Sequence, residues 1–268
     1  MKELFSINTG RGEPGGEKLS LRLGEKHCSY AVTDLSGNEL FDLAYCEIRT
    51  LNEHTLSAFR SAFPKIAAPY RQVQVSFDHS KAMLVPSWCY RPGEEGRLLK
   101  TMDGDTYGCD VISEPVTAWQ MYNIYGLPRD VQDWLNQQYP IKFTRHQYSL
   151  LLKSIPAMPE GCVLLDLRPT EFSVMAALGS RLLAAQTYDY SVPADVIFRL
   201  LKICQSFDIK QEEVQLRVSG LIDEESALFR DLRQYFVHIG FRNAGWNVPG
   251  PYPAQFFTAL NDLAVCAS

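Results

Sequence analysis

The stretch LSLRLGEKHCSYAV, residues 19–32, returns in outline as VLLDLRPTEFSVMA, residues 163–176. The first copy alternates leucines with polar residues, which is typical of a strand that buries one face. Both copies then pass through a short polar turn into a second run of strand-forming residues, so each predicts an antiparallel hairpin. Laid over each other without a gap, the two copies place Ser29 on Ser173. This spacing indicates an internal duplication.

The same order of elements is predicted in both halves of the chain: three strands, a helix, a strand, a helix and a strand. After the hairpins, the segments expected to form these elements are residues 39–48, 52–63, 71–77 (with a short strand at 82–85), 94–102 and 106–112 in the first half, and residues 182–188, 192–206, 214–218, 223–234 and 235–241 in the second. Asn52 is placed to cap the first helix. The sequence therefore predicts an α/β fold with two duplicated βββαβαβ lobes. The alternative is that two unrelated meanders occur in one α/β protein.

Further segments lie outside the duplicated order. Residues 7–18 are rich in glycine and predict a mobile arm, and helices are expected over residues 129–139, 144–155 and 254–265. We therefore predict a flexible N-terminal arm at residues 1–18, a first lobe with connecting helices at 19–158, and a second lobe with a C-terminal helix at 159–268.

Composition and charge exclude several classes of protein. The 268 residues carry 31 acidic and 26 basic side chains, a net charge of -5, with no block of lysine and arginine, so no nucleic-acid partner is expected. No stretch approaches the ~18 apolar residues of a membrane-spanning helix, and the first residues do not resemble a secretory signal. We expect a cytoplasmic protein without direct membrane insertion.

The seven cysteines and five histidines are scattered along the chain. No two cysteines are close enough to form a C-x-x-C pair, and the histidines have no partner at a metal-ligand spacing. Most cysteines stand among apolar neighbours, where a free thiol behaves as a small hydrophobic group. We therefore expect buried, reduced thiols and no metal site built from Cys and His.

Four segments occur in the order found in one superfamily of ATPases. They are LSLRLGEKHCSYAV (19–32), SEPVTAWQMYNIYGL (113–127), VLLDLRPTEFSVMAAL (163–178) and VQLRVSGLIDEESALFRDLRQYF (214–236). Together with the two lobes, they resemble the first phosphate hairpin, the connecting helix, the second phosphate hairpin and the adenosine motif of the actin, hexokinase and heat-shock chaperone superfamily. More narrowly, the chain is similar to a bacterial family of uncharacterised proteins with this fold. The resemblance implies an actin-like ATPase architecture with ribonuclease-H-like lobes.

The resemblance also implies roles for particular residues. Asp166 matches the aspartate that holds the metal and its water shell, and it is the candidate catalytic and metal-binding residue. Glu114, before the expected connecting helix, is the candidate that faces the cleft and orients a nucleophile. The candidate nucleotide contacts are Lys26, Thr170, Ser219 and Gly220. ATP with magnesium is the cofactor implied. A solvated turn charge at Lys26 and a helix-capping acid at Glu114 are the alternative interpretations.

The same segments depart from the superfamily pattern. At the position that the overlay equates with Asp166, the first hairpin has Arg22, which cannot coordinate magnesium. In the second hairpin Pro169 removes one N–H donor from the turn that should approach phosphate. Leu221 stands where a second glycine commonly lies flat against the adenine. Fast phosphoryl transfer depends on positioning and charge stabilisation, so these losses predict weak or absent hydrolysis.

Two functions from different classes are therefore expected. The first is an assembly or adaptor module with a degenerate nucleotide-binding cleft, which acts with an unknown protein partner or by self-association. The alternative is an ATP-dependent phosphotransferase that acts on a small molecule. An unrelated α/β fold with accidental motif matches is a third interpretation.

Overall fold

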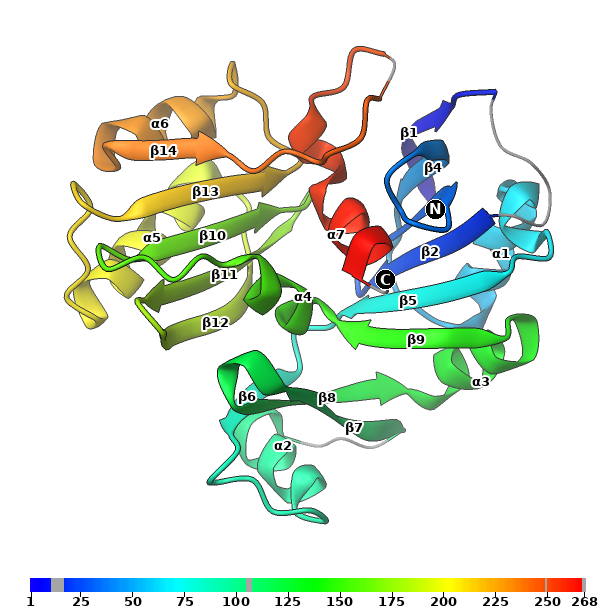
Figure 1. Cartoon of the computed structure of the whole chain (residues 1–268), viewed down its shortest axis with the longest axis horizontal. Helices are drawn as coiled ribbons and strands as arrows, with labels where there is room; N and C mark the ends of the chain where they lie inside the picture. The colour runs from blue at the N-terminus through cyan, green and yellow to red at the C-terminus, as the bar shows by residue number, and fades with distance from the viewer. Residues whose placement is uncertain (11–16, 105–107, 249, 267–268) are drawn as a thin grey trace. The chain divides into compact units, whose positions relative to one another are not determined.

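The computed structural model describes residues 1–10, 17–104, 108–248 and 250–266, and the chain divides into two compact units (Figure 1). Unit 1 comprises Met1–Leu150, Trp246–Gly250 and Leu260–Ser268, and unit 2 comprises Leu151–Gly245 and Pro251–Ala259. Each unit has a hydrophobic core of its own. None of the helices formed by the described residues combines the length and the apolar character that a membrane crossing needs.

Unit 1 is built on a six-stranded sheet with the order β1-β4-β3-β2-β5-β9. Its strands are β1 Lys2–Asn8, β2 Glu17–Gly24, β3 His27–Asp34, β4 Leu40–Glu47, β5 Gln72–Asp78 and β9 Ile141–His146. Buried side chains of helices α1 (Glu53–Ala62) and α3 (Arg129–Gln138), and of the short η1 (Pro64–Ala67), pack in one core with those of the sheet. The side chain of Asn52 accepts a hydrogen bond from the Thr55 N–H, which confirms the predicted cap of α1.

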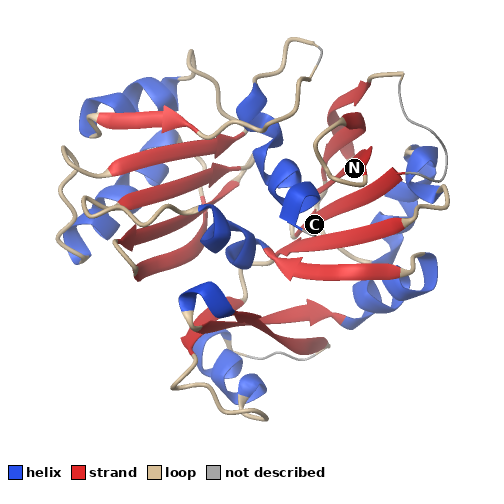
Figure 2. Cartoon of the chain, viewed as in Figure 1, coloured by secondary structure: helices blue, strands red, loops and turns tan. Residues whose placement is uncertain are grey.

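An insertion between β5 and α3 forms a small three-stranded sheet with the order β6-β8-β7 (Figure 2). Its elements are β6 Ala82–Pro86, α2 Glu95–Asp103, β7 Cys109–Val116, η2 Thr117–Trp119 and β8 Met121–Pro128. Within the described part of the chain, β7 is the last strand of this sheet, and β9 is the last strand of the six-stranded sheet. β7 and β9 are therefore edge strands of two different sheets of unit 1.

Unit 2 is built on a five-stranded sheet with the order β12-β11-β10-β13-β14. Its elements are β10 Cys162–Leu167, β11 Glu171–Leu178, β12 Arg181–Asp189, α5 Pro193–Ser206, β13 Gln215–Gly220, α6 Ala227–Tyr235, β14 His238–Phe241 and η3 Ala254–Phe257. Buried side chains of α5 and α6 pack with those of β10, β11 and β13 in one core. Along the chain, α4 (Gln147–Ser154) leads from the first unit into the second.

The predicted duplication is confirmed by strand order and register. The order β4-β3-β2-β5-β9 in unit 1 is the same as β12-β11-β10-β13-β14 in unit 2. Arg22 pairs with Ser29 across the first hairpin, and Asp166 pairs with Ser173 across the second, as the gap-free overlay requires. The last helix and strand of the first lobe are α3 and β9 rather than residues 94–102 and 106–112, because the insertion separates β5 from α3.

The helix predicted over residues 113–127 is wrong, because β7, η2 and β8 form an antiparallel hairpin there. Tyr122 and Ile124 are residues that favour a strand. Pro115 is tolerated because β7 is an edge strand, where a missing N–H need not break a ladder hydrogen bond. The helix predicted over residues 144–155 starts too early, since β9 runs to His146 before α4 begins.

The predicted domain boundaries also need correction. Part of the expected flexible arm, residues 1–18, is strand β1, which pairs antiparallel with β4, while residues 11–16 lie outside the described residues. Helix α7 (Thr258–Cys266) lies mostly in unit 1, although the sequence placed the C-terminal helix in the second lobe. Lys18 Nζ donates to the Ala264 carbonyl at 2.6 Å, and Gln74 Nε2 donates to the Leu263 carbonyl at 2.9 Å. Buried polar side chains of β2 and β5 therefore hold the end of α7.

Candidate functional site

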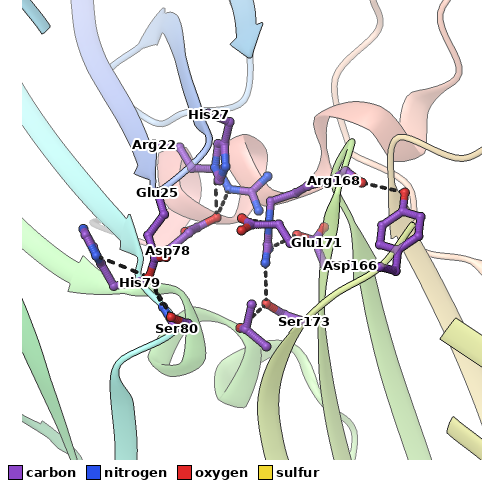
Figure 3. Close-up of polar contacts among 12 residues, drawn as sticks. Arg22, Glu25, His27, Asp78, His79, Ser80, Asp166, Arg168, Glu171 and Ser173 are labelled. Carbon is purple, nitrogen blue, oxygen red and sulfur yellow. Dashed lines mark hydrogen bonds and ion pairs between the residues drawn. The ribbon is translucent and has the colours of Figure 1, made fainter. Parts of the chain in front are cut away.

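A buried arginine organises the polar side chains of the β10–β11 hairpin in unit 2 (Figure 3). Arg168 Nε donates to Glu171 Oε1 at 2.7 Å, and its Nη1 lies 3.3 Å from Asp166 Oδ2. Its Nη2 donates to the Ser173 hydroxyl at 3.0 Å, and that hydroxyl lies 2.8 Å from the Thr187 hydroxyl. Only 1% of the Arg168 side chain is exposed, so its charge is compensated by carboxylates of the protein rather than by water.

The structure brings two of the predicted nucleotide contacts beside Asp166. Ser219 faces Asp166 across the parallel β10–β13 pair, and its hydroxyl donates to Oδ1 at 3.1 Å. Gly220 has a φ of 87°, and a Cβ there would lie 2.1 Å from the carbonyl oxygen of Leu167. The close approach of β13 to β10 therefore requires glycine at this position. Thr170 is exposed in the hairpin turn, where its carbonyl accepts a backbone hydrogen bond.

These residues of unit 2 do not fit a magnesium-bound nucleotide. Both carboxylate oxygens of Asp166 have partners in Ser219 and Arg168, and a magnesium ion here would lie against a guanidinium cation. The Arg168 N–H donates to the Glu171 carbonyl at 2.9 Å, and Pro169 has no N–H to offer a phosphate. Across the described residues, no group of three or more His, Cys, Asp or Glu side chains could hold a metal ion. Arg168 instead serves as the shared cation of Asp166 and Glu171.

The equivalent hairpin of unit 1 holds the opposite arrangement of charge (Figure 3). Arg22 Nε lies 2.6 Å from Asp78 Oδ2, and His27 Nε2 lies 3.3 Å from the same oxygen. All three side chains are buried. Ser29 and Ser76 flank Arg22 on the neighbouring strands, and their buried hydroxyls have no hydrogen-bond partner in the described part of the chain. Asp78 thus neutralises the arginine that stands in place of the expected carboxylate.

The turn between β2 and β3 carries a second, more exposed group (Figure 3). Glu25 Oε1 accepts hydrogen bonds from the Ser80 N–H at 2.9 Å and the Ser80 hydroxyl at 2.6 Å, and His79 Nδ1 lies 3.8 Å away. Lys26, a predicted nucleotide contact, is half-buried in this turn, and its carbonyl accepts the Ile48 N–H at 2.9 Å. An acidic side chain beside Lys26 weakens the attraction of this turn for a phosphate.

Glu114, the predicted nucleophile-orienting residue, lies within β7 and is buried. Its Oε2 accepts the backbone N–H of His146 at 3.0 Å, and its Oε1 lies 3.2 Å from Arg145 Nε. The guanidinium of Arg145 stands 4.2 Å from the ring centre of Phe143. Burial, followed by the charge of Glu114, raises the pKa of Tyr125. Glu114 therefore joins the insertion to β9 within unit 1.

Glu114 and Arg145 also line a cavity of about 210 Å³ in unit 1. Residues of β7, β8, β9 and α3 form its walls, with apolar side chains such as Leu135 and Ile141 beside the ion pair. Gln132 lines the cavity as well, and its buried Oε1 has no hydrogen-bond partner among the residues described. Its lining includes residues of β7 and β9, which are edge strands of two different sheets.

The sequence shows that Arg22 and the turn after β10 depart from the superfamily pattern. It does not show which side chains form ion pairs with the arginines at these places. Asp78 is the last residue of the buried strand β5, a place where polar side chains often gather, and this position is the signal that could have found it. Glu171 stands three residues after Arg168, at the other end of the hairpin turn. The cavity has no comparable signal, because it depends on how β7 and β9 approach each other.

Known proteins share this architecture. The family profile described as "Protein of unknown function (DUF3822)" matches residues 12–239. The structure resembles a Bacteroides thetaiotaomicron protein with actin-like ATPase fold and unknown function, with a TM-score of 0.75 and 16% identity over 87% of this chain and 93% of that chain. No curated protein matches the sequence.

Two further solved structures are similar in fold. One is a chain of the PilM-PilN type IV pilus biogenesis complex, with a TM-score of 0.65 and 11% identity over 94% of this chain and 99% of that chain. The other is the ethanolamine utilization protein EutJ from Carboxydothermus hydrogenoformans, with a TM-score of 0.53 and 9% identity over 97% of this chain and 92% of that chain. The chain therefore has the predicted actin-like ATPase fold, and these likenesses show the fold alone.

Proposed function

We propose that this chain, which belongs to the DUF3822 family of proteins of unknown function and has an actin-like ATPase fold, is an adaptor that binds an extended segment of a partner protein. The observation that carries the proposal is the cavity of unit 1, whose lining includes residues of the edge strands β7 and β9. An extended peptide can add to such an edge through main-chain hydrogen bonds, while pockets beside the edge select its side chains.

The lining of the cavity favours an uncharged, apolar side chain. Glu114 and Arg145 neutralise each other, and Leu135 and Ile141 supply apolar wall. Its volume of about 210 Å³ exceeds the ~150 Å³ of a cavity that admits benzene, so one leucine or phenylalanine side chain fits. A main-chain N–H of the bound segment would also supply a donor to Gln132 Oε1, which has none among the described residues.

The charged clusters of the two units support binding without ATP hydrolysis. In unit 2 the guanidinium of Arg168 takes the place beside Asp166 that a metal ion would need, and in unit 1 Arg22 is paired with Asp78. Electrostatic stabilisation by a metal and by backbone donors is the main source of rate in phosphoryl transfer, and both are weakened here. A chain of the PilM-PilN complex gives an example of this fold in an assembly with a partner.

A peptide library displayed on phage and selected on the immobilised chain tests the cavity. We expect enrichment of segments with one large apolar side chain, and Thr144→Trp, which fills the cavity, should weaken the selected peptide at least about tenfold in fluorescence anisotropy. Thr101→Trp is the matched control, because Thr101 is exposed on α2 and does not line the cavity. Equal binding to both variants would contradict the site, and the absence of any enriched sequence would contradict the adaptor.

Calorimetry and phosphate release with ATP and magnesium test the second half of the proposal. We expect no magnesium-dependent turnover above that of buffer. If turnover is measured and Asp166→Ala abolishes it, while Asp110→Ala at an exposed carboxylate does not, then the ATP-dependent phosphotransferase becomes the better-supported function.

A further inference from the structure

Helices α1 and α3 of unit 1 lie side by side and run in the same direction. The backbone N–H of Glu53, at the start of α1, donates to the carboxylate of Asp130, at the start of α3, at 3.3 Å. One turn later in both helices, the indole N–H of Trp134 donates to the hydroxyl oxygen of Ser57 at 2.9 Å. From this contact toward the C-terminal ends of both helices, their residues and those of η1 line a pocket of about 340 Å³.

This pocket, which we call the α1–α3 pocket, has one positive charge and no negative charge among the described residues that line it. Its polar lining comes from Ser57, Arg60 and Ser61 on α1 and from Gln138 on α3, and Arg60 supplies the charge. None of its lining residues also lines the cavity that carries the proposed function, so the two sites are separate.

Arg60 has no counter-ion of its own. Within the described part of the chain no carboxylate pairs with its guanidinium, and its buried Nε makes no hydrogen bond. The charge of Arg60 opposes the rise in the pKa of Tyr139 that burial causes, so the guanidinium lies near that buried ring. The place of Arg60 in the last turn of α1 suits the helix dipole, but the dipole supplies no acceptor for the Nε–H. A buried donor without an acceptor is rare in a folded protein and points to a missing partner.

Two further side chains of the pocket have protons to donate. The Ser57 hydroxyl accepts the indole N–H of Trp134, which leaves its single proton for another acceptor. Ser57 and Arg60 are three residues apart on α1, so they lie on the same face of the helix. The side-chain amide of Gln138 makes no hydrogen bond with the described residues. The pocket therefore offers several donors and no charged acceptor, a pattern that suits an oxyanion.

We propose that the α1–α3 pocket binds a small organic molecule through its carboxylate group. The Nε–H and one Nη–H of Arg60 match the two oxygens of a carboxylate, and the Ser57 hydroxyl can donate to the same group. The volume of about 340 Å³ exceeds the ~150 Å³ of a cavity that admits benzene, so the pocket has room for an apolar body as well. Pro64, Ala67 and the indole of Trp134 supply apolar wall for that body. This site is independent of the adaptor function.

Ligand-observed NMR titrations of the whole chain test the site with three probes of similar shape. Benzoate carries a carboxylate, benzamide is its neutral counterpart, and phenyl phosphate carries the other common oxyanion. We expect benzoate to bind at least about tenfold more tightly than benzamide, because only the anion pairs with the guanidinium. Equal binding of benzoate and benzamide, or no binding of any probe, overturns the proposal. Tighter binding of phenyl phosphate than of benzoate overturns the choice of a carboxylate.

Variants of Arg60 test where benzoate binds. Arg60→Gln should weaken benzoate at least about tenfold, and Arg60→Lys, which keeps the charge but loses the forked geometry, should recover only part of this loss. Arg49→Gln is the matched control, because Arg49 is exposed and does not line the pocket. If Arg60→Gln binds benzoate as tightly as the natural chain, the probe lies elsewhere and the site is wrong.

Ser61→Trp keeps the test decisive if the Arg60 variants do not fold. Ser61 is exposed in the last turn of α1, so a tryptophan there occupies the pocket without entering the core, and benzoate should bind at least about tenfold more weakly. Ser206→Trp, at an exposed serine in the last turn of α5, is the control and should bind benzoate as the natural chain does. Equal binding in the two variants would contradict the site. Circular dichroism and thermal melting of each variant separate lost binding from a lost fold.

Discussion

Arg22 and Asp166 occupy equivalent positions in two sheets of the same strand order, yet they carry opposite charges. Each is flanked by a serine on both neighbouring strands. In each unit a buried side chain of opposite charge lies beside it: Asp78, at the end of β5, for Arg22, and Arg168, in the hairpin turn, for Asp166. Both positions therefore hold ion pairs of the protein itself.

Replacement of Arg168 should destabilise unit 2 strongly. Arg168→Met leaves Asp166 and Glu171 buried without their cation, and removal of one partner of a buried pair typically costs about 3–5 kcal/mol. Urea unfolding measures this loss. Arg97→Met removes an exposed arginine that pairs with Glu94, and it should change the free energy of unfolding by less than about 0.5 kcal/mol. If the free energy of unfolding falls by a similarly small amount in both variants, the buried ion pairs of Arg168 do not stabilise the fold.

Gly220→Ala should lower the free energy of unfolding far more than Gly179→Ala. Both glycines have positive φ, but the Cβ of Gly220→Ala would lie 2.1 Å from a backbone oxygen of Leu167, while nothing lies within 4 Å of the Cβ of Gly179→Ala. Strain from φ alone costs about 1 kcal/mol, and the clash forces β13 away from β10 as well. Urea unfolding of both variants should show the difference, and equal losses would contradict the close approach.

Thiol reactivity should follow burial. Burial raises the pKa of Cys46 to about 12 and the pKa values of Cys162 and Cys204 to about 11, so their reactive thiolates are scarce near neutral pH. Cys89 is exposed. With a chromogenic disulfide reagent, we expect the fastest phase to come from Cys89, and we expect Cys46, Cys162 and Cys204 to react only after unfolding, together with the buried Cys28. Cys89→Ser should remove that phase and Cys162→Ser should leave it; a fast phase that survives Cys89→Ser would refute this assignment.

Stability should fall in alkaline solution, partly through Tyr125. Its raised pKa means that the folded chain keeps a proton that the unfolded chain loses near pH ~10. The contribution of Tyr125 to the free energy of unfolding is complete below that pH. It is lost as the pH rises, by up to about 1.4 kcal/mol per pH unit for one group. In Tyr125→Phe the free energy of unfolding should fall less steeply above pH ~10.

The control for this pH dependence is Tyr235→Phe, because 45% of Tyr235 is exposed. Its alkaline slope in urea unfolding should match that of the natural chain. An unchanged slope in Tyr125→Phe would mean that other groups carry the alkaline loss.

Local patterns predicted the fold well where the deciding contacts are close in sequence. The two hairpins and the cap at Asn52 follow from alternation, turn residues and a hydrogen bond within one helical turn. The pattern failed over residues 113–127, where Glu114 and Pro115 also suit the start of a helix. There the strand pairing of β7 with β8 overrides the local preference.

The candidate site was predicted in part. Asp166, Ser219 and Gly220 do lie together in unit 2, because the strands that carry them are neighbours in the repeated strand order. Glu114 and Lys26 belong to unit 1 and are held there by contacts within that unit.

By itself, the sequence determined the duplicated plan and the residues that depart from it, since periodicity and turn chemistry act between neighbours along the chain. The tertiary structure alone decided that Asp78 meets Arg22, that Arg168 folds back onto Asp166, and that β7 and β9 enclose a cavity. The contact of Asp78 with Arg22 and that of β7 with β9 join segments that are far apart along the chain, where no periodic pattern links them. Burial makes them obligatory, because a charge removed from water must find its partner within the fold.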